Sequence, residues 1–293
     1  VSQAIGTGGR DVKDAVGGIT FLDALQALAN DRETKVILLV AKPPQPGVLK
    51  KVKALLRKIK KPVVALFLGQ GGTPATLEEA ALLAVARANG QTPAQALAHL
   101  KRRDAILADE ARALVAKRKR PKGRYLRGLF SGGTFCAEAQ VVLDGVVRHL
   151  YSNAPLGDSQ KLKNAWKPEK NAVVDLGEDE FTVGRAHPMI DFTLRNKMIL
   201  EQAADPDVSV ILLDVVLGYG ANLDPAAELA PVIQQAAKKV FVVAGVNGTI
   251  GDPQNRAKTV EALREAGAHV QLTNAAACKL AGQIAAEVAR QNR

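Results

Sequence analysis

Cysteine is scarce in this sequence: the 293 residues include only Cys136 and Cys278, and these form no Cys-x-x-Cys pair. Such spacing excludes a disulfide framework or a cysteine-rich zinc site as the basis of the fold. The four histidines give no HxxxH or HExxH arrangement, so we expect no metal site. A chain with so few thiols fits a reducing compartment, and we expect it to be cytoplasmic.

Aromatic residues make up only 4% of the chain. Long apolar runs are also absent, and none approaches the roughly 20 residues that a membrane-spanning helix needs. The opening residues VSQAIGTGG have neither a basic flank nor a long apolar stretch, so we expect no secretory signal. The remaining composition, 47% hydrophobic and 24% charged, is typical of a globular chain with one large or two medium domains.

The charge balance is positive, with a net charge of +11 at pH 7. This favours anionic partners such as phosphates, CoA or nucleotides. Seven lysines and arginines lie between Lys117 and Arg127, and the simplest interpretation of this stretch is a solvated basic connector. No aromatic platform interleaves with these charges, so a nucleic-acid partner is not expected.

Apolar runs alternate with amphipathic helical stretches in both halves of the chain, as in a parallel sheet covered on both faces. Three segments of the first half are predicted strands: QAIGTG, KVILLVA and PVVALFLG. Five segments of the second half are predicted strands, the number in a flavodoxin-like doubly wound domain: LRGLFSG, NAVVDLG, VSVILLDVVLG, KVFVVAGV and HVQLTN. Between the halves, the chain from Thr92 to Lys119 is predicted to be helical, and Thr92 with Gln95 resembles a capping box.

These patterns predict an α/β fold with two flavodoxin-like doubly wound parallel-sheet domains. The first domain spans residues 1–91, a basic helical connector spans residues 92–122, and the second domain spans residues 123–293.

The two halves are related by an internal duplication. ALQALANDRETKVILLV (24–40) matches MILEQAADPDVSVILLD (198–214), with Asp31 over Asp205. In each half a glycine-containing loop precedes this stretch, and a helix and a second strand follow it. Two equivalent loops imply pseudo-twofold domains, each with a helix N-terminus at the carboxyl ends of its strands.

The first half lacks a counterpart of the strand and helix-like stretch that open the second half, LRGLFSG and AEAQVVLDGVV. One strand and one crossover helix need about 25 to 30 more residues. We therefore expect the native polypeptide to extend upstream of Val1.

Glycine-rich and hydroxyl-bearing loops follow predicted strands in both halves. The first, with Gly8, Gly9 and Arg10, could present backbone N–H groups and a guanidinium to a phosphate, although any tight turn also favours glycine. It lacks GxGxxG spacing, so a dinucleotide site of that type is not expected. The second loop lies between a strand and a helix, where hydroxyls and free amides would meet an anion; it consists of Ser131, Gly132, Gly133 and Thr134.

A histidine lies beside a third loop. His187 precedes a helix and is a candidate acid, base, anion ligand or phosphoryl carrier, although it could equally hold the loop structurally. The neighbouring Pro188, Met189 and Asp191 belong to the same candidate site, and Asp191 also suits a helix N-cap. Asn247 ends a strand at the same edge of the predicted sheet.

Five motifs, in order, resemble the FdrA family of the acyl-CoA synthetase (succinyl-CoA ligase) superfamily: VSQAIGTGGRD, RGLFSGGTFCAEA, AHPMIDFTLRN, ILLDVVLGYG and AGVNGTIGDPQNR. The resemblance covers nearly the whole chain. It implies two CoA-ligase domains that face each other and handle an acyl phosphate or phosphate between them. It also implies CoA or phosphate as the ligand, and other enzyme subunits or a second copy as partners.

The resemblance leaves three functions open. The chain is either part of an acid–thiol ligase, or a subunit of a carbamoyltransferase acting on oxamate and carbamoyl phosphate in allantoin catabolism, or a non-catalytic scaffold. The stretch GQGGTPATLEEAALL lacks the Gly-His segment that carries the phosphorylated histidine of succinyl-CoA synthetases. Neither a CoA-binding Rossmann domain nor an ATP-grasp domain is found in these residues, so ATP-dependent ligation by this chain alone is not expected.

Overall fold

The computed structural model describes residues 1–118 and 123–292. They form two compact units, an N-terminal unit of Val1–Lys101 and a C-terminal unit of Arg102–Arg293. The division falls inside helix α4 (Pro93–Lys117), in the stretch expected to be a helical connector. This helix begins with a capping box, because the Thr92 N–H donates to Gln95 Oε1 (2.9 Å) and the Gln95 N–H donates to Thr92 Oγ1 (3.3 Å). The end of the expected connector, residues 119–122, lies outside the described residues.

The N-terminal unit holds one pair of parallel strands, β1 and β2, in which Ile37 lies opposite Val63. Phe21, Leu25, Val48 and Val52 are buried against one face of this pair. The elements of the unit are α1 (Ile19–Asn30), β1 (Ile37–Ala41), α2 (Pro46–Leu56), β2 (Val63–Phe67), α3 (Leu77–Ala88) and the start of α4. It is thus an α/β unit with a small sheet.

The predicted strand QAIGTG, residues 3–8, is wrong. Residues 1–8 have no strand pairing and are almost all exposed. A strand forms only where its backbone groups pair with a neighbour, and among residues 1–101 the β1–β2 pair is the whole of the sheet. The local sequence is suited to a strand, but no ladder is available to it there.

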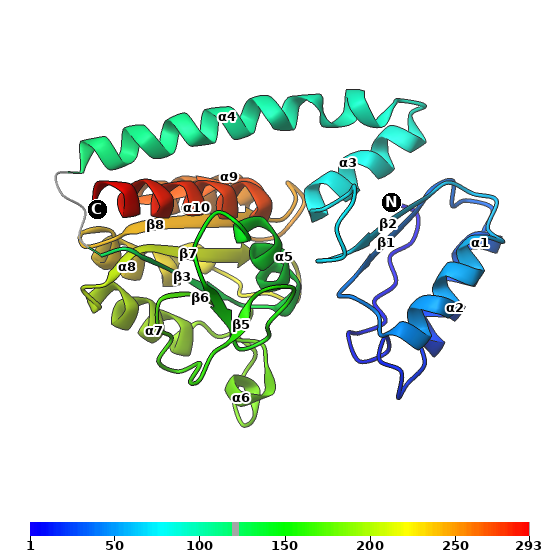
Figure 1. Ribbon diagram of the computed structural model, residues 1–293, viewed down its shortest axis with the longest axis horizontal. Helices are drawn as coiled ribbons and strands as arrows, with labels where there is room; N and C mark the ends of the chain where they lie inside the picture. The colour runs from blue at the N-terminus through cyan, green and yellow to red at the C-terminus, as the bar shows by residue number, and fades with distance from the viewer. Residues whose placement is uncertain (119–122, 293) are drawn as a thin grey trace. The chain divides into compact units, whose positions relative to one another are not determined.

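The C-terminal unit is built on a seven-stranded sheet in the order β5-β4-β6-β3-β7-β8-β9 (Figure 1). All of its strand pairs are parallel. The elements, in chain order, are β3 (Tyr125–Phe130), α5 (Gly133–Leu143), β4 (Leu150–Ser152), β5 (Gln160–Lys161), β6 (Asn171–Asp175), α6 (Asp179–Thr182), α7 (Thr193–Ala204), β7 (Val208–Val216), α8 (Pro225–Ala237), β8 (Phe241–Asn247), α9 (Arg256–Glu265), β9 (Ala268–Gln271) and α10 (Asn274–Gln291).

The predicted α/β class is confirmed. Numbered along the chain, the five predicted strands β3, β6, β7, β8 and β9 lie in the order 2-1-3-4-5 of flavodoxin-like sheets. The short strands β4 and β5, which were not predicted, extend the sheet beyond β6. In such a sheet the chain changes winding direction between the first and third strands, here β3 and β7, and ligands bind at the carboxyl ends of those strands.

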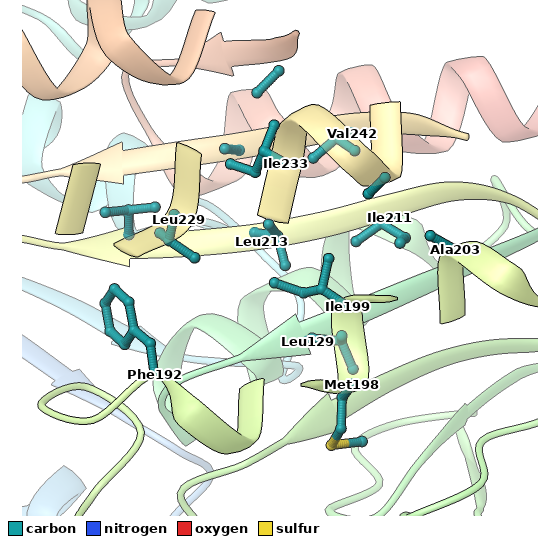
Figure 2. Packing of buried hydrophobic residues seen from close by; sticks show 14 of the residues in the cluster. Leu129, Phe192, Met198, Ile199, Ala203, Ile211, Leu213, Leu229, Ile233 and Val242 are labelled. Carbon is teal, nitrogen blue, oxygen red and sulfur yellow. The ribbon is translucent and has the colours of Figure 1, made fainter. Parts of the chain in front are cut away.

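Strand β7 is apolar almost throughout because helices cover both faces of the sheet. Ile211 and Leu213 belong to one buried cluster, together with side chains of α7 and α8 such as Ile199 and Ile233 (Figure 2). Leu212 belongs to the opposite cluster, which includes residues of α4, α5 and α10.

The internal duplication is visible in the register of the strands. In the N-terminal unit α1–β1–α2–β2 repeats the order of α7–β7–α8–β8 in the C-terminal unit. Ile37 pairs with Val63, and Ile211, which matches Ile37 in sequence, pairs with Val242. Both units therefore contain a parallel strand pair at the equivalent place in the chain order.

The sheet edge at β9 gives a prediction for the pH dependence of stability. Burial, with repulsion from the Arg118 guanidinium, lowers the pKa of His269. The unfolded chain binds this proton at the ordinary pKa of about 6.5, whereas the folded chain does so only at lower pH. The free energy of unfolding should therefore fall as the pH drops from about 7.5 to about 5.5, with a slope of at most about 1.4 kcal/mol per pH unit from this group.

Urea unfolding at the two pH values measures this effect, and His269→Gln should reduce the slope. An equal slope in both proteins would show that other groups cause it.

Candidate functional site

The loop between β3 and α5 lies at the carboxyl edge of the sheet, beside the change in winding direction. Gly132 is the N-cap of α5 and has extended backbone. The N-cap has no side-chain hydrogen bond, and the first turn of α5 has no acidic residue. Thr134 is exposed. The helix therefore begins with backbone N–H groups and a partial positive charge, an arrangement that attracts an anion.

A buried carboxylate holds this loop in place. Asp214, near the end of β7, accepts hydrogen bonds from the Ser131 N–H (2.8 Å) and from Ser131 Oγ (2.6 Å). Ser131 is buried. Its hydroxyl is thus directed at Asp214, and Ser131 orients the loop from beneath.

The charge of Asp214 is balanced by an equally buried arginine. Arg195 Nη2, from the first turn of α7, lies 2.9 Å from Asp214 Oδ1, and both side chains are 0% exposed. Nη2 also donates to the Asp214 carbonyl oxygen. Burial lowers the pKa of Arg195, and the charge of Asp214 opposes that shift. The ion pair joins β3, β7 and α7 below the Ser131 loop.

Three loops meet at Gly177, just after β6. A Cβ atom built on Gly177 would lie 3.1 Å from His187 Nε2, 3.1 Å from Asp175 Oδ1 and 3.3 Å from the Ser131 carbonyl oxygen. The structure therefore brings His187 together with the Ser131 loop, although 56 residues separate them in sequence. A glycine at this position leaves room for the close approach.

The orientation of His187 follows from a bond inside its own loop. The Met189 N–H donates to His187 Nδ1 at 3.2 Å. In the neutral ring, a nitrogen that accepts leaves the proton on the other nitrogen, so Nε2 carries the hydrogen and faces Gly177. Met189 also lies near the loop between β3 and α5, because a Cβ on Gly132 would lie 3.9 Å from Met189 Cε.

Asp191 lies just before α7, whose N-cap is Phe192 and not Asp191 as the sequence suggested. Its Oδ1 accepts from the Thr193 N–H at 2.8 Å, and hydrogen bonds from Thr193 lower the pKa of this carboxyl group. Asp191 is exposed and Pro188 is buried. The contact with Thr193 gives Asp191 a part in shaping the loop.

Two amides connect the His187 loop to the loops after β7 and β8. The Asn222 N–H donates to the Met189 carbonyl oxygen and Asn222 Nδ2 donates to the Ile190 carbonyl oxygen, both at 2.8 Å. Gln254 Nε2 donates to the carbonyl oxygens of Asn222 (3.0 Å) and Gly218 (2.7 Å). Sequence reasoning missed Asn222 and Gln254, since nothing local distinguishes them from loop residues.

Asn247 lies at the end of β8, and β7 separates that strand from β3. Its Nδ2 donates to the Gly245 carbonyl oxygen at 3.0 Å. The described contacts thus place Asn247 at the same edge of the sheet as the Ser131 loop, but not against it.

Gly8, Gly9 and Arg10 form an exposed turn of the N-terminal unit, where the Asp11 N–H donates to the Gly8 carbonyl oxygen at 3.3 Å. The N-terminus of the following helix, α1, is capped by a side chain of the same loop. Asp11 Oδ1 accepts from the Thr20 N–H (3.1 Å), and Asp11 Oδ2 accepts from the Phe21 N–H (2.8 Å). The start of α1 thus already holds a carboxylate, unlike the start of α5.

Within residues 1–118 and 123–292, no group of three or more His, Cys, Asp or Glu side chains could hold a metal ion. The same part of the chain contains no helix long and apolar enough to cross a membrane. A surface pocket at the β4 edge is lined by other residues than those predicted: Tyr151, Leu162, Lys163, Asn164, Lys167, Glu169 and Lys170.

A family model for CoA-ligase matches residues 129–284, the range from β3 to α10 that contains both the Ser131 and His187 loops. YahF of Escherichia coli (strain K12), described as an uncharacterized protein, is 36% identical over 277 residues, which is 91% of this chain and 54% of YahF. The chain therefore spans about half the length of this curated relative.

Two solved structures are also similar. PH0766 from Pyrococcus horikoshii OT3 is 15% identical, with a TM-score of 0.41 and coverage of 91% of this chain and 55% of PH0766. The dinucleotide forming acetyl-coenzyme A synthetase 1 of Ca. Korarchaeum cryptofilum, in complex with phosphate and ADP, is 15% identical, with a TM-score of 0.44 and coverage of 92% and 58%.

Proposed function

This chain belongs to the CoA-ligase family, and on that premise we propose that its C-terminal unit binds the phosphate group of an acyl phosphate at the loop between β3 and α5. Within the family we take the chain to be of the FdrA type, on the five motifs described above. Two observations support the site: the N-terminus of α5 has no side-chain cap, and the preceding residue Ser131 meets His187 at Gly177.

The chemistry follows from these groups. The backbone N–H groups of Gly133 and Thr134 would bind phosphate oxygens, and the helix dipole would stabilise their charge. His187 would donate its Nε2 hydrogen to one oxygen of the same phosphate. When the acyl group passes to an acceptor, the C–O bond to phosphate breaks and the charge on the leaving phosphate grows, so these donors would stabilise the transition state.

Carbamoyl phosphate and acetyl phosphate are both mixed anhydrides of phosphate, and the same loop would bind either one. A carbamoyltransferase subunit is thus the second form of the proposal, and the ligand that binds more tightly separates the two. The proposed site also includes Gly132, Met189 and Asp191, which shape the loops. Gly8, Gly9 and Arg10 of the N-terminal unit, and Asn247 of the C-terminal unit, remain proposed anion-binding residues of their own units.

We predict that His187→Ala weakens the binding of acetyl phosphate or inorganic phosphate by about 10- to 100-fold. A hydrogen bond to a charged group contributes about 1.5 to 3 kcal/mol, and each 1.4 kcal/mol is a factor of ten in Kd. Isothermal titration calorimetry with phosphate, acetyl phosphate, carbamoyl phosphate and CoA measures the effect. His99→Ala, at an exposed histidine of α4, is the matched control and should bind as the unchanged protein does.

Each outcome is decisive. Absence of binding by all four ligands contradicts the site, and equal affinities of His187→Ala and the unchanged protein contradict the role of His187. A scaffold is separated from an enzyme by assaying transfer in a complex with partner subunits. Activity that is lost in His187→Ala while the complex stays intact excludes the scaffold.

A further inference from the structure

The surface pocket beside β4 has a positively charged wall. It lies within the C-terminal unit and has a volume of about 120 Å³. Its lining includes Lys163, Lys167 and Lys170 against one carboxylate, Glu169. Among the described residues, none of these three lysines forms an ion pair. Three ammonium groups around one hollow repel one another, and an anion between them would relieve that repulsion.

Two uncharged side chains of the pocket add hydrogen-bond donors to this wall. Asn164 Oδ1 accepts from the Trp166 N–H at 2.9 Å, so the carbonyl end of the amide is engaged and the Nδ2 end is left for a ligand. Tyr151 Oη lies 3.5 Å from Lys170 Nζ. An ammonium group can only donate, so the hydroxyl accepts from Lys170 and keeps its own hydrogen for a ligand. The pocket is thus rich in donors and poor in acceptors.

Lys170 reaches the pocket from a strained backbone. Its φ is +56°, in the left-handed region that is costly for a residue with a Cβ and suits glycine. The side chain lies over the Tyr151 ring, with Nζ 5.4 Å from the ring centroid. Backbone strain of this kind clusters at ligand-binding sites, where the surrounding structure maintains it. The conformation lowers stability, yet it places an ammonium group at the pocket wall.

We propose that this pocket binds the dianionic phosphate group of a phosphate monoester. A phosphate monoester carries close to two negative charges and three strong acceptor oxygens, which match a wall of three lysines, one glutamate and two neutral donors. Lysine binds such a group as a point charge and needs no fixed planar geometry. Leu162, which is buried, offers an apolar side to the carbon chain of the ester.

The pocket is separate from the Ser131 loop. Tyr151 lies within β4, and Lys170 immediately precedes Asn171, the first residue of β6. The Ser131 loop instead follows β3 at the carboxyl edge of the sheet. The inference is therefore independent of the proposed acyl phosphate site, and each can fail without the other.

Isothermal titration calorimetry with glycerol 3-phosphate measures the affinity of the pocket. Every protein compared also carries His187→Ala, so that binding at the Ser131 loop is weakened equally in all of them. The pocket variant replaces the three lining lysines with glutamine: Lys163→Gln, Lys167→Gln and Lys170→Gln. The control variant makes the same change at three exposed lysines elsewhere in the unit: Lys238→Gln, Lys239→Gln and Lys258→Gln.

The pocket variant should bind glycerol 3-phosphate about 10-fold or more weakly, because three charge-assisted contacts are lost together. The control variant has the same net charge and should change the affinity by less than about 2-fold, since distant surface charges are screened by salt. Equal affinities of the two variants, or no binding by the protein with all its lysines, would overturn the proposal.

Lysine acetylation followed by peptide mass spectrometry locates the ligand. At a glycerol 3-phosphate concentration about ten times its Kd, acetylation of Lys163, Lys167 and Lys170 should slow by about 10-fold, because the free pocket is then rare. Lys238 should react at an unchanged rate. The same protection is expected in His187→Ala. Its absence at the three lysines, or its loss in His187→Ala, would overturn a separate site.

Two further comparisons test the role of Lys170 and the class of ligand. Lys170→Gly removes the ammonium group but suits the left-handed backbone, so it should weaken binding by about 3-fold or more without lowering the Tm. Unchanged binding would refute the role of Lys170. Succinate carries the same charge on two carboxylates, and tighter binding of succinate than of glycerol 3-phosphate would refute the assignment to phosphate monoesters.

Discussion

Replacing Asp214 with alanine is expected to lower the free energy of unfolding of the C-terminal unit by about 3 to 5 kcal/mol. The change leaves the Arg195 guanidinium buried without its counter-charge, and two of its nitrogens, Nε and Nη1, already have no hydrogen-bond partner among the described residues. It also removes both acceptors of Ser131. Few single substitutions combine an unpaired buried charge with the loss of a hydrogen-bonded loop.

Urea unfolding followed by tryptophan fluorescence measures this loss. The single tryptophan, Trp166, belongs to the C-terminal unit and packs on Phe181 with ring centroids 4.7 Å apart. Asp158→Ala, at an exposed aspartate of the same unit, is the matched control and should shift stability by no more than about 0.5 kcal/mol.

A double-mutant cycle tests the coupling between the two charges. Arg195→Met combined with Asp214→Leu should be less destabilising than the sum of the single changes, because the double variant leaves no charge unpaired. Single effects that add to within about 0.5 kcal/mol would show that the pair is not coupled.

The sequence was sufficient to predict the sheet of the C-terminal unit, because strands buried on both faces are recognisable as short apolar runs. Strand β7, with Ile211 and Leu213, is the clearest case. The meeting of Ser131 and His187 was also predictable, since loops that follow parallel strands gather at one edge. The pairing of Arg195 with Asp214 was not, although a carboxylate near the end of an apolar run was a signal. Its partner is set by the packing of α7 on β7.

The predicted strand at residues 3–8 shows what the local sequence could not predict. Its local sequence suits a strand, but a strand needs a neighbour, and pairing is a property of the whole sheet. The start of α1 was not predictable either: Asp11 accepts hydrogen bonds from the Thr20 and Phe21 N–H groups there, a contact set by the tertiary structure.

Replacing Gly123 with alanine is the second change expected to have a large effect, about 3 kcal/mol or more of unfolding free energy. Gly123 has φ +77°, and an added Cβ would lie 2.4 Å from the Val208 carbonyl oxygen and 2.5 Å from its carbon. The left-handed conformation alone costs an L-residue about 1 to 2 kcal/mol. The collision with backbone at the start of β7 adds to this, because a backbone carbonyl cannot move aside as a flexible side chain can.

A second glycine separates these two contributions. Gly145 has φ +68° and nothing within 4 Å of an added Cβ, so Gly145→Ala should cost only the conformational term, about 1 to 2 kcal/mol. Urea unfolding monitored by Trp166 fluorescence compares the two variants.

If they are equally destabilised, the chain entering β3 can shift away from Val208. A larger loss for Gly123→Ala means that β3 is fixed against β7 at its first residues, as the hydrogen bonds from Arg124 and Tyr125 to the Asp207 carbonyl oxygen require. The pairing of β3 with β7 then also fixes the position of the Ser131 loop, which follows β3 at its other end.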